Sequence, residues 1–590
     1  MTATGGTETP VYDYIILLVI EAGQHNSLLE STHFAGGWSQ LFDGPGDWNI
    51  ITEPNPGVND RRIKASRGKL LGGSSGVNGT LCIRGTKQDY DDWNMPGWSG
   101  DEVFEYMKKA ETFHPKDWFK ENAKAHGYDG PLHTEPHDVA PISNLILESM
   151  QDKGLKFGSD IFTTGDNPHG CGHAPRTVYK GKRSVAADYL VGKGPNLTIL
   201  TETLVDKVIL DGEGTDLRAI AVKVLDKDGK ETEIKARKEI VVSGGAYCSP
   251  TILLRSGIGP KSELASHGIE CKVDLPGVGK NLIDHLICFI FYSTNKPGLT
   301  NDDLLYKPGA LQEAMRQWKE EKRGVLSTFP FGVFGFACLD DRLVDEPLWT
   351  SAPRDPGRDP MGLTPAQPNV EFFSTELYGG PKIYDQPPDG ENTHAFSLIA
   401  ELFAPKSRGE VTLRSADPQD TPIVNNNYLS DELDVLVLSE ACRFANEIIT
   451  EGKGTRDITD GSWPKELVHH GYKTREEWIR FVRDNAITCY HPGGTCKMGS
   501  SEDPMAVLDA ELRVRGVNGL RVADTSVMPL LNQGHTQMPA YAIGEKAADL
   551  LKEASSTAVP ATKKTKNGRP VSFFRNPFQI SYKKYLNKNR

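Results

Sequence analysis

The feature that most constrains the fold is a short apolar run near the start of the chain, Tyr14 to Ile20, with Asp13 before it and Glu21 after it. This run of 7 residues is too short to cross a bilayer and lacks the flanks of a signal peptide, so we interpret it as buried strand sequence. Glu21 lies 8 positions after Asp13 (21 − 13 = 8). A crossover between parallel strands needs about a dozen residues or more. No strand–helix–strand unit therefore fits here.

The bulk properties narrow the class of protein. At 590 residues the chain exceeds what one hydrophobic core usually serves, so we expect two domains or a discontinuous pair. The net charge of -12 argues against nucleic acid as a partner, because phosphate binding relies on an excess of Lys and Arg. The 9 cysteines are scattered and form no CxxC pair, so we predict no metal site and no disulfide framework. With no signal peptide or membrane span, we expect a cytoplasmic protein; the sequence does not specify an oligomeric state.

Two glycine-marked segments carry further information. Gly68–Gly79, GKLLGGSSGVNG, holds 5 glycines and 2 serines in 12 residues. Such a loop suits a backbone that approaches a flat ligand closely and offers N–H groups to it. The second segment, Gly245–Gly259, predicts a helix that opens at Ser249-Pro250 in the order N-cap and N1, and that ends at Gly257.

A third region contains two histidines in similar settings. His491 lies in YHPGGTCKMG and His535 in NQGHTQMPAY, and a short strand ending at Asp524 lies between them. A single loop histidine is usually an ordinary surface residue, whereas imidazole is also the commonest proton acceptor in active sites. The pair is therefore a candidate catalytic site.

These three segments together resemble the two signature patterns and the C-terminal active-site region of the glucose–methanol–choline (GMC) family of FAD-dependent oxidoreductases. The resemblance runs from about Tyr12 to Ala554 and is strongest to fungal aryl-alcohol-oxidase-type and natural-product dehydrogenases, which suggests secondary metabolism as the setting. It implies an α/β fold, α+β overall, with a discontinuous Rossmann-like FAD-binding domain and a sheet-containing substrate domain.

The implied domain boundaries follow the order of the motifs. We expect the FAD-binding domain at 11–90, 183–285 and 486–554, and the substrate-binding domain with its lid segments at 91–182 and 286–485. The basic tail, 555–590, has 9 Lys or Arg and no Asp or Glu, and we expect it to be disordered.

The resemblance also implies roles for individual residues. His491 matches the catalytic histidine of the family, and His535 matches a second active-site position that is His or Asn among members. Imidazole, with an ordinary pKa of about 6.5, suits the removal of a hydroxyl proton, while the hydride passes to flavin N5. Val77 stands where some members carry a histidine that tethers FAD, so we expect non-covalent FAD. The residues expected to contact FAD are Glu21, Gly72, Ser74, Asn78, Gly79, Thr80, Val205, Asp524, His535 and Thr536.

One departure from the family bears on the cofactor. Members begin with a strand, a GxGxxG turn, a helix, and a second strand that ends in a ribose-binding Glu before Ala-Gly; here VYDYII runs directly into LLVIEAG at Ile16 and Leu17. The helix N-terminus that would receive the pyrophosphate is missing, so we expect compromised FAD binding. Two explanations stay open, a coding sequence assembled without an exon and a pseudoenzyme. The clean edges of the missing unit favour the first.

The leading hypothesis is FAD-dependent oxidation of a small-molecule alcohol to a carbonyl compound. The alternatives are a redox-neutral lyase or cyclase on the same cofactor, an FAD-deficient binding protein, and, least favoured, a nicotinamide enzyme. Ser327–Ala337 holds 4 phenylalanines and predicts a buried strand in preference to an apolar pocket wall. Asp340–Pro368, rich in Pro and Asp, predicts a long surface loop.

Overall fold

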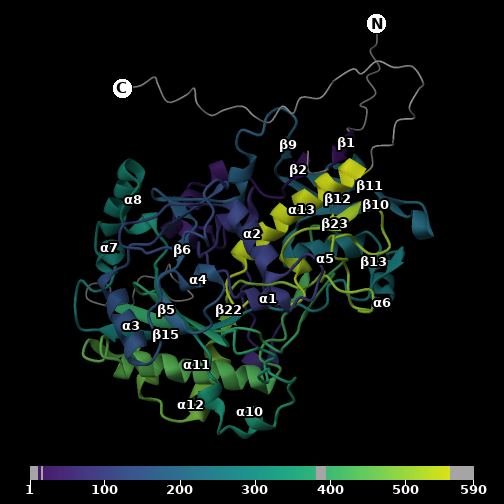
Figure 1. The fold of residues 1–590 in the computed structure, drawn as a ribbon. Helices are drawn as coiled ribbons and strands as arrows, with labels where there is room; N and C mark the ends of the chain where they lie inside the picture. The colour runs from purple at the N-terminus through teal and green to yellow at the C-terminus, as the bar shows by residue number, and fades with distance from the viewer. Residues whose placement is uncertain (1–10, 15–17, 380–393, 558–590) are drawn as a thin grey trace, which may run out of the picture. The chain divides into compact units, whose positions relative to one another are not determined.

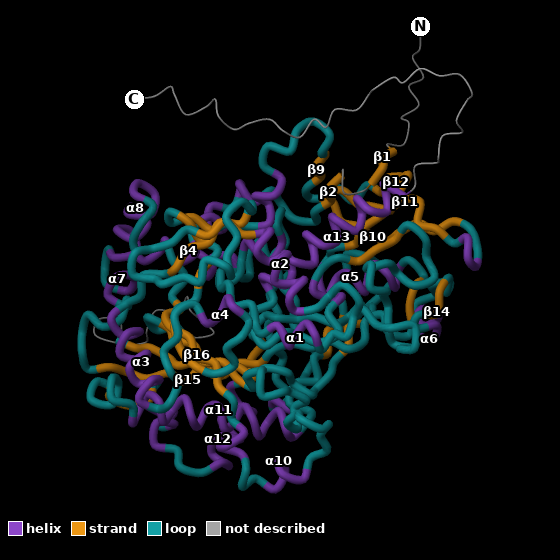
Figure 2. The backbone as a smooth tube through the Cα atoms, viewed as in Figure 1, coloured by secondary structure: helices purple, strands orange, loops and turns teal. Residues whose placement is uncertain are grey.

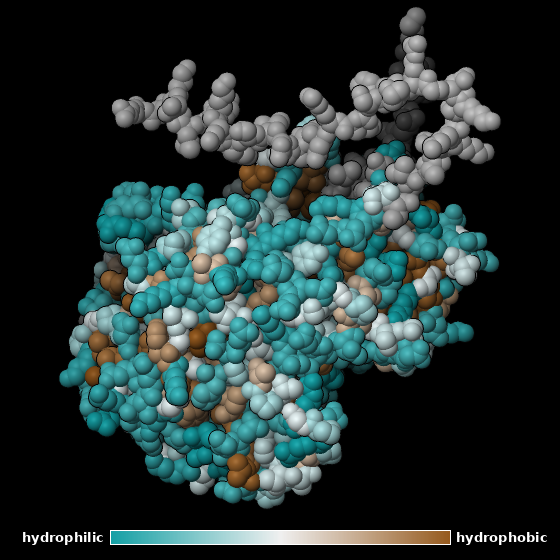
Figure 3. All heavy atoms as spheres, viewed as in Figure 1, coloured by the Kyte–Doolittle hydropathy of each residue, from teal (hydrophilic) through white to brown (hydrophobic). Residues whose placement is uncertain are grey.

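The computed structural model describes residues 11–14, 18–379 and 394–557. The chain divides into two compact units, residues 1–548 and 549–590, and the sheets and the candidate site belong to the first. Most of the predicted basic tail, 558–590, lies outside the described residues. No helix among the residues described is both long enough and apolar enough for a bilayer crossing. On the face in view, the first unit is mainly hydrophilic with scattered small apolar patches (Figure 3).

The first sheet is built around β12 (Glu231–Val242). β10, β11 and β12 form an antiparallel meander, whereas β1 and β23 pair with β12 in parallel. The other strands of this sheet are β1 (Val11–Tyr14), β10 (Thr203–Asp211), β11 (Arg218–Asp226) and β23 (Leu520–Val522).

β1 and β2 (Leu18–Ile20) are neighbours in the sequence but belong to different sheets. β1 pairs with β12, with Tyr14 opposite Glu239, while β2 pairs in parallel with β9 (Thr198–Leu200). Only 3 residues separate Tyr14 from Leu18, far fewer than a parallel crossover needs. The two halves of the predicted first unit are therefore present as separate strands, and their junction at Ile16 and Leu17 lies outside the described residues.

The second sheet has seven strands, in the order β21-β15-β18-β17-β16-β5, with β22 also paired to β15. Its central strands are short continuous apolar runs, which is the pattern of strands buried on both faces. The long helix α11 (Glu432–Glu451) packs against β18 and β15, and α12 (Arg475–Asn485) packs on α11 (Figure 1). The strand predicted within Ser327–Ala337 is confirmed as β16. The strands are β5 (Gly170–Gly172), β15 (Leu286–Thr294), β16 (Phe331–Ala337), β17 (Val370–Thr375), β18 (Ala395–Leu402), β21 (Thr459–Ser462) and β22 (Ile487–Thr488).

Shorter elements and long loops connect the two sheets (Figure 2). Asp340–Pro368, predicted to be a surface loop, contains two short helices, and Leu343 and Trp349 on them are buried in the core of the second sheet. Most other residues of the segment are irregular and exposed or half-buried, so the surface-loop prediction is confirmed for most of it, and these two side chains anchor the segment to the core. The other helices are α1 (Lys87–Asp91), α2 (Gly100–Ala110), α3 (Pro141–Asp152), α4 (Ile161–Thr164), α6 (Lys261–Ser266), α7 (Asp303–Tyr306), α8 (Ala310–Glu321), α9 (Asp340–Leu343), α10 (Pro347–Ser351) and α13 (Gln537–Thr557). The remaining strands are β3 (Glu111–Phe113), β4 (Leu132–Pro136), β6 (Pro175–Arg176), β7 (Val178–Tyr179), β8 (Lys182–Arg183), β13 (Ile258–Gly259), β14 (Val273–Asp274), β19 (Glu410–Thr412) and β20 (Ile423–Asn425).

The helix α5 (Gly245–Arg255) begins earlier than predicted. The sequence placed Pro250 at the first helical position, but the helix is already formed before it, so Pro250 lies inside. Proline has no N–H for the carbonyl four residues back. Thr495 Oγ1 donates instead to that carbonyl, the oxygen of Ala246, at 2.6 Å. Gly257, with φ +81°, follows the end of the helix as predicted.

Thr495 offers a test of this arrangement. We expect Thr495→Val to lower the free energy of unfolding by about 1–3 kcal/mol, because the Ala246 carbonyl loses its donor in a buried setting. Thr495→Ser keeps the hydroxyl and should be clearly less damaging. Urea unfolding followed by circular dichroism measures both variants, and equal losses for the two would contradict the assignment.

Candidate active site

A cavity of about 1100 Å³ is bounded by β2, β10, β12, α5, the glycine-rich loop and the two histidine turns. It is slightly larger than the roughly 300–1,000 Å³ usual for small-molecule pockets, as an extended ligand would require. Every residue predicted to act in catalysis or to contact the cofactor lines it. These residues are Glu21, Gly72, Ser74, Asn78, Gly79, Thr80, Val205, His491, Asp524, His535 and Thr536.

The glycine-rich loop forms one wall of the cavity. Gly72 and Gly73 have φ values of +101° and +55°, which favour glycine, and lead into a short 3₁₀ turn, Gly73–Gly76. Ser75 Oγ donates to the Gly72 carbonyl at 2.6 Å. A Cβ atom on Gly68 would lie 2.3 Å from the Gly73 carbonyl oxygen. The loop therefore folds back on itself, and only glycine permits its close approach.

Asn78 at the end of this loop is held in place by a buried cation. Arg183 Nη1 donates to the Asn78 carbonyl at 2.6 Å and to Asn78 Oδ1 at 2.9 Å. The Thr80 N–H donates to the same Oδ1 at 3.0 Å. Burial lowers the pKa of Arg183 to about 9, so it is still charged at neutral pH. The segment from Asn78 to Thr80 thus presents a rigid backbone to the cavity.

Glu21 and Val205 lie together where β2 ends. The Glu21 N–H donates to the Leu200 carbonyl at 2.8 Å, and the Thr203 N–H donates to the Glu21 carbonyl at 3.0 Å. Glu21 Oε1 accepts from the Gly23 N–H at 2.7 Å. Burial raises the pKa of Glu21 to about 7. This part of the cavity wall therefore contains both residues expected to contact the adenosine of FAD, Glu21 for the ribose and Val205 on β10 for the adenine.

Asp524 occupies the N-terminus of α5. Its Oδ2 accepts from the Gly245 N–H at 2.9 Å and from Ser249 Oγ at 2.6 Å, and its Oδ1 accepts from the Ser526 N–H at 2.8 Å. A carboxylate is favourable at the positive end of a helix dipole. The α5 N-terminus is consequently already paired with a negative charge.

The two predicted histidines face each other. Their ring centroids are 4.6 Å apart with an interplanar angle of 78°. The His491 N–H donates to Asp284 Oδ1 at 2.9 Å, and the His535 N–H donates to the Ile83 carbonyl at 3.0 Å. Backbone anchors on different elements thus set the position of each imidazole.

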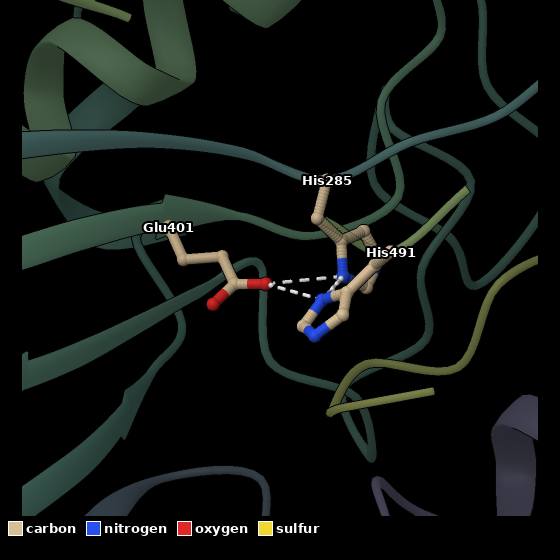
Figure 4. A group of neighbouring side chains, drawn as sticks. All are labelled: His285, Glu401 and His491. Atoms are coloured by element: carbon tan, nitrogen blue, oxygen red, sulfur yellow. Dashed lines mark hydrogen bonds and ion pairs between the residues drawn. The ribbon is translucent and has the colours of Figure 1, made fainter. Parts of the chain in front are cut away.

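A buried carboxylate lies behind each imidazole. Glu371 on β17 and Glu401 on β18 are directly opposite each other in the ladder. Glu371 Oε2 lies 2.8 Å from His535 Nε2. Glu401 Oε1 lies 3.2 Å from His491 Nδ1 and 3.1 Å from His285 Nδ1 (Figure 4). The second sheet thus places Glu371 against His535 and Glu401 against His491, and Glu401 Oε2 also lies 4.0 Å from His535 Nε2.

The electrostatics separate the roles of the two histidines. Burial lowers the pKa of His491 to about 3, so it is neutral near pH 7. Burial also lowers the pKa of His535, but the charge of Glu371 outweighs it and the net pKa is raised. Burial raises the pKa of Glu371 to about 7. Burial likewise raises the pKa of Glu401, but hydrogen bonds from His285 and His491 outweigh it and hold that pKa below its ordinary value. His491 is therefore the ring that is unprotonated near neutral pH, whereas the surroundings of His535 favour its protonated form.

Three members of this cluster were not predicted from the sequence. Glu371 and Glu401 each lie in a buried strand, VEFFST and AFSLIAEL. A carboxylate in such a strand indicates a functional or paired residue, because a buried charge requires a partner. His285 ends the family-like segment LPGVGKNLIDH, to which no site role was assigned.

The cluster also has the spacing of metal ligands. Ligand atoms of His285, Glu401 and His491 lie within 4.8 Å of one another, as do those of Glu371, Glu401 and His535. The residues come from segments far apart in the sequence, so cysteine and histidine spacing did not reveal them. The absence of a metal stays a prediction.

Comparison with known proteins identifies the family. Family models for the GMC oxidoreductases match residues 12–287, for the N-terminal part, and residues 405–544, for the C-terminal part. An oxygen-dependent choline dehydrogenase of Sinorhizobium fredii is 33% identical over 514 residues, which is 85% of each chain. The chain belongs to the GMC oxidoreductase family.

Solved structures agree with this assignment. A formate oxidase is 27% identical, with a TM-score of 0.85 over 94% of this chain and 100% of that chain. Pyridoxine 4-oxidase from Mesorbium loti is 25% identical, with a TM-score of 0.74 over 90% of this chain and 94% of that chain. A fungal aryl-alcohol oxidase, 23% identical with a TM-score of 0.74 over 92% of this chain and 99% of that chain, shares the fold. The predicted α/β fold, the family and the enzyme class, an FAD-dependent oxidoreductase acting on alcohols, are confirmed.

FAD is the cofactor of GMC oxidoreductases, as predicted, and most of the cavity fits it. The rigid backbone from Asn78 to Thr80 and the two histidines fit a flavin ring, and the corner at Glu21 fits the adenosine. The part of the site that would hold the pyrophosphate differs from the family pattern. The chain has no room for a helix between β1 and β2, and the N-terminus of α5 is paired with Asp524, whose charge repels phosphate. The weaker FAD binding expected from the sequence stays a prediction.

Restoring the missing unit should restore the cofactor. We predict that a family-type strand–turn–helix insert between Ile16 and Leu17 yields a yellow protein with stoichiometric FAD, because the insert supplies a helix N-terminus to the pyrophosphate. The unmodified chain should purify without flavin. Absorbance near 450 nm measures both, and stoichiometric FAD in the unmodified 590-residue chain would overturn this prediction.

Glu21 predicts a pH dependence of stability. Its pKa rises from an ordinary 4.5 to about 7 in the folded chain. The folded state then holds the Glu21 proton more tightly than the unfolded state does. The contribution of this proton to the free energy of unfolding is therefore present in full below about pH 4.5 and is lost as pH rises through about 7. Glu21→Gln, neutral at every pH, should raise Tm relative to the parent at pH 8 and leave it nearly unchanged at pH 4.5. Equal shifts at both values would show that Glu21 ionises normally.

Proposed function

We propose that this protein oxidises an alcohol to the corresponding carbonyl compound with FAD, and that His491 accepts the hydroxyl proton. The observation that carries this proposal is the pair of facing imidazoles in the cavity wall, 4.6 Å apart between centroids, each backed by a buried carboxylate. Burial keeps His491 neutral, so one of its ring nitrogens has a lone pair available to a substrate hydroxyl.

His535 supports the same step from the other side of the substrate oxygen. Its Nε2 lies 2.8 Å from Glu371 Oε2, which favours the protonated ring and leaves Nδ1 as a donor to the substrate. A donor aimed at an oxygen that gains negative charge stabilises the transition state. Bound FAD supplies the acceptor for the hydride that leaves the carbon.

The cavity wall favours an apolar alcohol. Five phenylalanines line it, two of them from the segment that also forms β16, and apolar and aromatic side chains dominate pockets for apolar ligands. We propose an aromatic or other apolar primary alcohol as the substrate, which accords with the predicted setting in secondary metabolism. The five residues are Phe42, Phe289, Phe329, Phe331 and Phe373.

Choline is the second candidate. Relatives 33% identical to this chain are choline dehydrogenases, and aromatic rings attract quaternary ammonium groups. In the FAD-loaded chain with the restored insert, anaerobic bleaching of the flavin by benzyl alcohol or by choline distinguishes the two substrates. No bleaching by any alcohol would favour the redox-neutral or FAD-deficient alternatives.

The proposed roles, proton acceptor for His491 and hydrogen-bond donor for His535, are testable in the FAD-loaded chain with the restored insert. We expect His491→Ala to slow reduction of the flavin by alcohol about 10²–10⁴-fold, the usual effect of a positioned acid–base group. His535→Asn should slow it less, because an amide still donates to the substrate oxygen. Anaerobic stopped-flow absorbance isolates this step from reoxidation.

Both variants must retain their flavin absorbance, since lost cofactor mimics lost catalysis. Acid precipitation of the same samples should release the flavin, because Val77 offers no tether. A parental rate in His491→Ala, or a larger loss in His535→Asn, would reverse the assignment of the two roles.

A further inference from the structure

Glu401 occupies an electrostatically unfavourable place. It lies in β18 between buried apolar residues, its side chain has no exposed surface, and Glu371 of β17 lies directly opposite. Like charges directly opposite in a ladder are destabilising, and a buried carboxylate requires donors or positive charge around it. Two imidazoles and the thiol of Cys489 are the groups that the structure brings to Glu401.

Three atoms form a nearly equilateral triangle at this point (Figure 4). Glu401 Oε1 lies 3.1 Å from His285 Nδ1 and 3.2 Å from His491 Nδ1, and the two Nδ1 atoms are 3.1 Å apart. Both rings therefore present the same nitrogen to one carboxylate oxygen. The His491 side chain is 10% exposed, whereas that of His285 is fully buried.

The triangle admits two proton arrangements. In the first, both Nδ1 atoms carry a proton and donate to Glu401, so Nε2 of His491 is unprotonated. In the second, His285 Nδ1 donates to His491 Nδ1, and the proton of His491 lies on Nε2, where it blocks the base. An ionised carboxylate is the stronger acceptor, because charge-assisted hydrogen bonds are roughly twice as strong as neutral ones.

We propose that Glu401 is a positioning residue that selects the tautomer of His491, holding its proton on Nδ1 and leaving Nε2 as the atom that accepts a proton from the substrate. His285 shares the same oxygen as a second donor. With its proton on Nδ1, His285 leaves no N–H group unpaired, since its buried Nε2 then carries none. That Nε2 and both oxygens of Glu401 have no hydrogen-bond partner among the described residues, and the two imidazoles approach Glu401 at ion-pair distance.

The consequence for catalysis rests on the proposed function. When His491 Nε2 accepts the hydroxyl proton, the ring becomes a cation 3.2 Å from Glu401. A carboxylate behind a base both fixes its tautomer and stabilises the imidazolium. Glu401 therefore serves His491, while Glu371 serves His535.

The tautomer is measurable without cofactor or substrate. The full chain, labelled with ¹⁵N-histidine and free of FAD, is studied by long-range ¹H–¹⁵N correlation at pH 7.5, and the His491 signals are those lost in His491→Gln. We expect a protonated Nδ1 and an unprotonated Nε2 in the parent. In Glu401→Gln the proton should move to Nε2 or exchange between both nitrogens.

Glu371→Gln is the matched control, because it removes the neighbouring carboxylate and should leave the His491 tautomer unchanged. A proton on His491 Nε2 in the parent overturns the proposal even if Glu401→Gln does not fold, and so does an unchanged tautomer in a folded Glu401→Gln. A divalent metal ion found in the purified parent by elemental analysis also overturns it, because Nδ1 would then hold a metal. Failure to oxidise any alcohol would instead count against the proposed function alone.

Discussion

Three residues separate Tyr14 from Leu18, and the cofactor site depends on that length. Such a short connection cannot return the chain to the start of a neighbouring parallel strand. As a result, β1 pairs with β12, and β2 pairs with β9 in a separate sheet. No helix follows β1 to point its N-terminus into the cavity. The helix that does begin there, α5, has Asp524 on its first N–H group. This connection therefore does not supply the helix N-terminus from which the sequence predicts pyrophosphate binding.

The chemistry depends on a different part of the chain. β17 and β18 of the second sheet each direct one carboxylate toward an imidazole, and backbone hydrogen bonds hold both histidines from outside that sheet. None of these contacts involves the segment before Leu18. The candidate catalytic cluster is therefore independent of the segment that lacks the GxGxxG unit, a combination that favours a missing coding segment over the gradual decay of a pseudoenzyme.

The sequence predicted those features that depend on residues close together in the chain. Glycine clusters, apolar strand runs and histidine turns indicated the cavity wall, β16 and the pair formed by His491 and His535. Contacts between segments far apart in the sequence could not be predicted. Thr495 allows α5 to continue past Pro250 from 245 positions away (495 − 250 = 245), and the pairing of Glu371 with Glu401 requires the strand register. The domain boundaries stay predictions, although the strands of the first sheet fall within the expected FAD-binding segments.

The missing phosphate cradle is tested most directly by titrating the unmodified chain with riboflavin and with flavin mononucleotide, following the quenching of flavin fluorescence. The two ligands share the ring and ribityl chain and differ by one phosphate. Because α5 presents the carboxylate of Asp524 in place of free N–H groups, we predict that the phosphate adds no affinity and that flavin mononucleotide binds as weakly as riboflavin or more weakly. Flavin mononucleotide binding more than about tenfold tighter, a gain of about 1.4 kcal/mol, would contradict this conclusion.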